Sequence, residues 1–124
     1  MITIDIDNKT KSTIPATKDI ESAIFDILKE KGFDINCEID IKIVSKDEIQ
    51  KLNKKYRKLN KPTDVLSFPQ FDKPPARHAS AGVAGGPKVP ILLGDIIICP
   101  EMATDDILFL VKHSVLHLLS YHHK

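Results

Sequence analysis

What the rest of the fold must bury is decided by the segment Thr104-Asp-Asp-Ile-Leu-Phe-Leu-Val-Lys-His113-Ser-Val-Leu-His117-Leu-Leu-Ser-Tyr-His-His-Lys124. Its apolar residues cover nearly the whole circumference of a helix, and they are Ile107, Leu108, Leu110, Val111, Val115, Leu116, Leu118 and Leu119. A helix that is apolar on all sides is normally buried. Thr104, followed by Asp105 and Asp106, predicts the N-cap and an acidic first turn. We therefore expect a buried C-terminal helix.

The same segment offers a set of possible metal ligands. His113 and His117 are four residues apart, so a helix projects both imidazoles from one face, where they can reach one zinc ion at about 2.0–2.1 Å. His123 follows just beyond the point where such a helix could turn back. Three imidazoles that leave a fourth position for water are typical of a catalytic zinc site. The alternative is a pair of packed or solvent-facing histidines followed by a frayed terminal His-His-Lys.

Length and composition predict one globular domain over residues 1–124. The chain is 42% hydrophobic and 28% charged, and its net charge of +1 gives no general attraction to polyanions. Any nucleic-acid binding must then come from local patches. The first residues lack the pattern of a signal peptide, and no apolar run has membrane-spanning length, so we expect a cytoplasmic protein. In that reducing compartment Cys37 and Cys99 are expected to be buried free thiols.

The hydrophobic periodicity predicts alternating strands and helices. Period-two alternation or short apolar runs predict strands at 2–7, 38–44, 64–68 and 92–99. An amphipathic stripe predicts a helix over 17–31 that ends at Gly32. Ser45 and Glu48 form a capping box, which predicts the start of a second helix that continues through Tyr56. Residues 73–90, rich in Pro, Gly and Ala, are expected to form a flexible surface loop. The fold class is α+β, with a mixed sheet of about four strands packed against helices.

Three blocks, in this order, carry a resemblance to a known family. The first is Leu52-Asn-Lys-Lys-Tyr-Arg57-Lys-Leu-Asn-Lys-Pro-Thr-Asp-Val-Leu-Ser-Phe-Pro69, the second is Leu93-Gly-Asp-Ile-Ile-Ile-Cys99, and the third is the closing histidine block. Together they resemble the YbeY family of metal-dependent endoribonucleases, which act in ribosomal RNA maturation. The resemblance implies a zincin-like arrangement with the metal-site histidines on the C-terminal helix. It also implies ribosomal RNA, and with it the small ribosomal subunit, as partners.

The resemblance assigns roles to individual residues. His113, His117 and His123 match the positions of the metal ligands, and one Zn²⁺ per chain is implied, with Ni²⁺ or another divalent ion possible in a preparation. Arg57 is implied to clamp a phosphate near the metal and to act in catalysis with His113 and His117. The basic block around it, which includes Lys54, Lys55 and Lys58, suits contacts with the RNA backbone, although a solvated helix face has the same pattern.

The sequence departs from the family pattern at three places in the closing block. Ser114 and Ser120 stand where the family has glycine, and His122 stands where it has aspartate. These changes favour, as an alternative, a catalytically weakened RNA-binding or ribosome-binding factor with the same fold. A zinc peptidase is a further alternative, but the glutamate that such an enzyme needs directly after the first histidine is replaced by Ser114.

Overall fold

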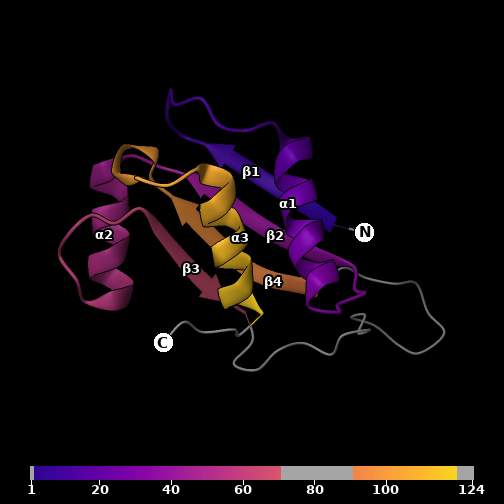
Figure 1. The fold of residues 1–124 in the computed structure, drawn as a ribbon. Coiled ribbons are helices and arrows are strands. Elements are labelled where there is room, and N and C mark those ends of the chain that lie inside the picture. The colour runs from indigo at the N-terminus through magenta and orange to yellow at the C-terminus, as the bar shows by residue number, and fades with distance from the viewer. Residues whose placement is uncertain (1, 71–90, 120–124) are drawn as a thin grey trace.

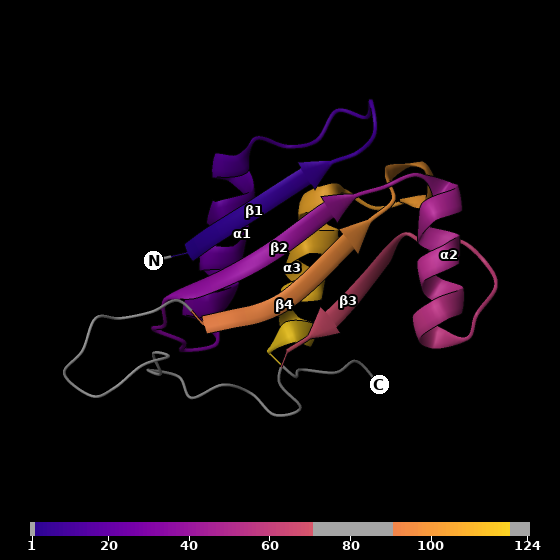
Figure 2. The ribbon, with the colours of Figure 1, turned by 180° about the vertical axis from the view of Figure 1, so that it is seen from behind.

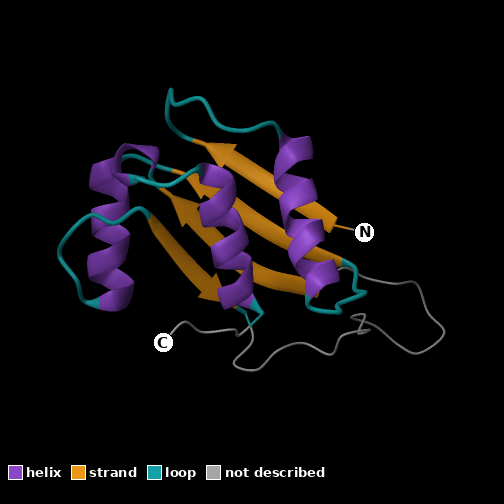
Figure 3. Ribbon diagram, in the orientation of Figure 1, coloured by secondary structure: helices purple, strands orange, loops and turns teal. Residues whose placement is uncertain are grey.

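The computed structural model describes residues 2–70 and 91–119. The elements in chain order are β1 (Ile2–Asn8), α1 (Thr17–Glu30), β2 (Cys37–Ile43), α2 (Lys46–Arg57), β3 (Val65–Pro69), β4 (Ile91–Ile98), the short 3₁₀ helix η1 (Pro100–Met102) and α3 (Ile107–Leu118). Figure 3 separates these helices and strands by colour. The predicted α+β class is confirmed. The loop predicted over residues 73–90 lies outside the described residues.

The four strands form one mixed sheet. The spatial order is β1-β2-β4-β3, in which β1, β2 and β4 run parallel and β3 runs antiparallel to β4. β4 is therefore a central strand, as its apolar sequence predicts. β1 and β3 form the two edges, so structures attached to them lie at opposite sides of the sheet (Figure 1).

The two faces of the sheet differ because strand residues alternate between them. α1 and α3 cover one face, where they bury a core that includes Ile39, Ile41, Ile43, Ile96 and Ile98. The other face carries polar residues on β1 and β2, and no described helix crosses these two strands on that side (Figure 2). α2 stands at the β3 side, where Ile49 packs with Leu66 and Ile97 in a second, smaller core.

Local signals explain where most elements begin and end. The Ser45 side chain accepts a hydrogen bond from the Glu48 backbone N–H at 3.3 Å, as expected for an N-cap, and Gly32 takes a φ of 78° just after α1. The strand expected over residues 64–68 runs from Val65 to Pro69 in the structure, and Pro69 lies opposite Gly94. An edge strand tolerates proline because the missing N–H need not pair with a neighbour.

The last helix starts later than predicted. Its N-cap is Asp106, whose carboxylate accepts from the Leu108 backbone N–H at 3.2 Å, so Thr104 is not the cap and no acidic residue lies in the first turn. Asp106 is the residue closest to the apolar run, and a carboxylate caps at least as well as a hydroxyl.

Burial of α3 is one-sided, which corrects the expectation of a helix buried all round. Leu110, Val111, Val115 and Leu118 are buried, whereas the Phe109 side chain is 54% exposed. Because α3 belongs to an outer layer of two helices, only the stripe that meets the sheet and α1 is covered.

Both cysteines are buried free thiols, as predicted. Burial raises the pKa of the Cys37 thiol to about 11, against a smaller opposing effect of the positive N-terminus. The thiol is therefore protonated and unreactive at neutral pH.

Candidate active site

His113 and His117 lie one turn apart on the same side of α3. Their ring centroids are 4.7 Å apart with an interplanar angle of 65°, and both side chains are partly buried. Phe109, one turn earlier, stacks on His113 with centroids 6.1 Å apart and 28° between the rings. The three rings form one stripe along the helix, as the i, i+4 spacing requires. The expectation that the helix brings the two imidazoles together is therefore met.

The donor chemistry of this pair fits a zinc or nickel ion, because each neutral imidazole can supply one nitrogen ligand. Within residues 2–70 and 91–119, no group of three or more His, Cys, Asp or Glu side chains is placed to hold a metal ion. The third expected ligand, His123, lies outside the described residues, as do Ser120 and His122. The full ligand set therefore stays a prediction.

Ser114 sits between the histidines in sequence but faces the core. Its side chain is fully buried, and its hydroxyl oxygen has no hydrogen-bond partner among the described residues. Leaving a buried hydroxyl unpaired costs about 1–3 kcal/mol. This unpaired hydroxyl lies in the helix that carries the candidate ligands.

The basic residues gather at the C-terminal end of α2. Lys54, Lys55, Arg57 and Lys58 all have exposed side chains, and no hydrogen bond or ion pair of the Arg57 guanidinium is found among the described residues. Lys55 places its Nζ 5.1 Å from the centroid of the Tyr56 ring. Cationic groups that are not engaged in ion pairs with the protein are suited to contacts with phosphates.

Two side chains hold this basic end in place. The buried Asn53 donates from Nδ2 to the Lys61 carbonyl oxygen at 2.9 Å, which fixes the loop after α2. Tyr56 packs edge to face on Phe68 of β3, with ring centroids 5.1 Å apart. Asn53 and Tyr56 belong to the Leu52–Pro69 block, but the sequence pattern alone assigned them no role. The available signal was the position of Asn53 on the buried side of α2, with Ile49.

The basic end and the histidine pair come from different helices that both contact β3. α2 meets β3 beside the polar face of the sheet, and α3 packs against the apolar face. A groove of about 350 Å³ runs between α2 and the polar face, and its lining includes Tyr56, Phe68 and Asp95. Asp95 lines this groove because it alternates with the buried Ile96 along β4 and so faces the polar side of the sheet.

Comparison with known proteins places this chain in a family. The family model described as Endoribonuclease YbeY matches residues 4–124. A protein named Endoribonuclease YbeY from Clostridium tetani is 35% identical over 142 residues, covering 97% of this chain and 84% of the relative. The chain belongs to the YbeY endoribonuclease family. A Staphylococcus aureus protein of the same name is 35% identical over 135 residues, covering 99% and 84%.

The YbeY fold is also recognisable in a solved structure. The solution structure of a protein from Thermotoga maritima matches with a TM-score of 0.54 and 25% identity, and the match covers 100% of this chain and 75% of that protein. YbeY membership agrees with the resemblance seen in the three sequence blocks. Among the described residues, no helix is long and apolar enough to cross a membrane.

Proposed function

We propose that this chain is a metal-dependent single-strand endoribonuclease that acts in ribosomal RNA processing in the cytoplasm. Membership of the YbeY family supports an RNA endonuclease role. The observation that supports metal dependence is the pairing of His113 and His117 on one side of α3. Its partners would be ribosomal RNA and the small ribosomal subunit.

His113, His117 and His123 would together hold one Zn²⁺, or Ni²⁺ or another divalent ion in a preparation. When bound, the ion would supply Lewis acidity and a water of lowered pKa. The stacking of Phe109 on His113 restricts the orientation of that imidazole ring. A ring held in one orientation presents its ligating nitrogen with less loss of entropy.

Arg57 would act on the scissile phosphate. Its guanidinium is always charged and can donate two parallel hydrogen bonds to the non-bridging oxygens, which stabilises negative charge that develops there. Lys54, Lys55 and Lys58 would attract the RNA backbone without reading its sequence. Their exposure on one helix end supports this role.

A weakened enzyme that still binds RNA is the second candidate. The observation in its favour is the buried, unpaired hydroxyl of Ser114, which destabilises the helix that carries the histidines. In this case RNA binding persists without turnover. A Ser114→Gly variant, which restores the family's residue, would then cleave RNA faster than the wild type.

Cleavage of an end-labelled single-stranded RNA tests the proposal. His117→Ala and added chelator should each abolish cleavage, and Arg57→Ala should lower its rate by about 10²-fold. Lys51→Ala removes a charge from the same helix outside the proposed site and serves as the control. An Arg57→Ala variant as active as Lys51→Ala would remove Arg57 from the mechanism.

Elemental analysis tests the metal separately. The wild type should hold close to one divalent ion per chain, and His117→Ala should lose it, because two imidazoles bind far more weakly than three. Lys112→Ala, on the same helix, should retain the ion. Equal metal content in the wild type and His117→Ala would refute the site, whatever the RNA assay shows.

A further inference from the structure

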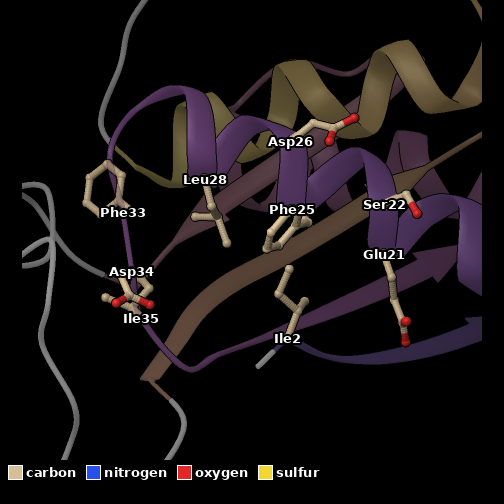
Figure 4. Close-up of a pocket in the computed structure, with 9 residues that line it drawn as sticks. All are labelled: Ile2, Glu21, Ser22, Phe25, Asp26, Leu28, Phe33, Asp34 and Ile35. Atoms are coloured by element: carbon tan, nitrogen blue, oxygen red, sulfur yellow. The ribbon is translucent and has the colours of Figure 1, made fainter.

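A groove of about 470 Å³ lies on the far side of the molecule from the basic end of α2. It runs between α1, the start of β1 and the segment that leads into β2 (Figure 4). We call it the α1 groove, and its lining residues are Ile2, Glu21, Ser22, Phe25, Asp26, Leu28, Phe33, Asp34 and Ile35. Since β1 and β3 are opposite edges of the sheet, the α1 groove and α2 are separated by its full width.

The floor of the α1 groove is apolar. Phe25 projects from α1 towards Ile2, with Leu28 beside it, as Figure 4 shows. The Phe25 side chain is 55% exposed, although most large apolar side chains of α1 are buried against the core. Aromatic side chains are enriched at the centres of protein interfaces, so an exposed ring beside a concave apolar surface can serve as a contact for a partner.

The rim of the α1 groove is acidic. Glu21, Asp26 and Asp34 contribute carboxylates, and no Lys, Arg or His is among the nine residues that line the groove. Such a rim repels the phosphates of RNA and attracts ammonium and guanidinium groups. The charge of this surface is thus opposite to that of the basic end of α2.

We propose that the α1 groove is a docking site for a basic protein segment that carries one apolar anchor residue. The anchor packs on Phe25 and Ile2, and flanking lysines or arginines reach Glu21 and Asp34. A central apolar anchor with a charged rim is the usual anatomy of a protein interface. Because the groove and α2 lie at opposite edges of the sheet, the chain can hold such a partner and an RNA strand at once.

A peptide titration followed by amide NMR shifts of the full chain tests the proposal. The probe is a short lysine-rich peptide with one central leucine, and its shifts should map to the α1 groove. Phe25→Ser and Glu21→Lys should each weaken binding by at least about tenfold. RNA cleavage by Phe25→Ser should equal that of the wild type, because the groove is separate from the proposed active site.

Matched controls make the result specific. Phe109→Ser removes a ring of nearly equal exposure, 54%, from α3, and Asp5→Lys makes the same charge reversal on β1 outside the groove. Both variants should bind the peptide as the wild type does. A loss in these controls equal to that in Phe25→Ser and Glu21→Lys would overturn the assignment.

Changes in the peptide itself need no protein variant. Replacing its leucine by glycine, or its lysines by glutamates, should abolish the shifts. The proposal fails if the peptide with glycine in place of leucine binds as well as the original, or if no peptide binds up to about 1 mM. It also fails if a single-stranded RNA shifts the same amides, or if self-association of the chain alone accounts for the shifts.

Discussion

At the scale of single residues, Gly94 controls how closely β4 can approach its neighbours. Its φ is +147°, a conformation that residues with a side chain rarely adopt. A Cβ atom built there would collide with the Phe68 carbonyl oxygen and lie 2.8 Å from the Leu118 Cδ2 atom. The glycine therefore lets β3, β4 and α3 meet at one point, directly beneath the C-terminal end of the helix that carries the histidines.

We predict that Gly94→Ala lowers the free energy of unfolding by about 2–5 kcal/mol, the sum of backbone strain and overpacking. Denaturant unfolding followed by circular dichroism measures the change. Gly32→Ala, at a φ of 78° with no such close neighbours among the described residues, should cost only about 1 kcal/mol and serves as the comparison. Equal losses in the two variants would mean that β4 can shift to accept the methyl group.

At the scale of elements, the end of α2 combines strain with proposed function. Lys58 is the C-cap and has a left-handed conformation, with φ 62° and ψ 24°. Its N–H and that of Leu59 donate to the Lys54 and Asn53 carbonyls at 3.2 and 3.3 Å, which ends the helix and starts the loop. Glycine is the usual residue at such a turn. The lysine keeps a positive charge at the tip of the basic end at a cost in stability.

We expect Lys58→Gly to raise the free energy of unfolding by about 1 kcal/mol, because glycine adopts this conformation without strain. Lys54→Gly, inside the helix, should lower it by about 1 kcal/mol. Both variants lose one charge, so both should bind single-stranded RNA more weakly and with a smaller salt dependence. Thermal unfolding measures the change in stability, and RNA titration measures the change in binding. If Lys58→Gly is less stable than the wild type, the lysine side chain makes contacts that outweigh the backbone strain.

At the scale of the whole molecule, the polar face of the sheet carries a row of like charges. Asp5 on β1 is paired in register with Asp40 on β2, which is paired with Asp95 on β4. This row was not predicted from the sequence, although strand alternation alone puts each carboxylate on the polar face. Partial burial, the neighbouring charges of Asp95, Glu38 and Asp5, and a hydrogen bond with Asp95 raise the pKa of Asp40.

A raised pKa means that the folded chain binds the Asp40 proton more tightly than the unfolded chain does. The contribution of this group to stability is therefore complete below its unfolded pKa and is lost as the pH rises through its folded pKa. Asp40→Asn should raise the free energy of unfolding at pH 7 by about 0.5 kcal/mol, the scale of one like-charge cross-strand pair. The gain should vanish in acid and shrink in high salt.

The control for Asp40→Asn is Asp7→Asn, on the same face. Asp7 forms an ion pair with Lys9 at 3.8 Å and is in register with Lys42, so its removal should not stabilise the chain. Chemical unfolding at several pH values measures both variants. If Asp7→Asn stabilises the chain as much as Asp40→Asn does, the stabilisation comes from the change in net charge and not from repulsion within the row of Asp5, Asp40 and Asp95.

The sequence by itself determined the elements and the family. The alternation in β1 and β2, the Ser45 cap, the turn at Gly32 and the apolar run of β4 are local patterns, and local patterns follow from backbone geometry and hydrophobic periodicity. The i, i+4 spacing likewise brought His113 and His117 together before any fold was known. Arg57 and the lysines near it were placed on one helix end by the same reasoning.

Only the tertiary structure decided how these elements share space. Two helices on one face left the Phe109 side of α3 exposed, which sequence periodicity could not reveal because it does not show which neighbours pack against a helix. The contact of β3 with both α2 and α3, the alignment of three aspartates across the sheet and the acidic groove beside Phe25 all depend on strand order and packing. Those are properties of residues distant in sequence, and local patterns carry no information about which distant residues meet.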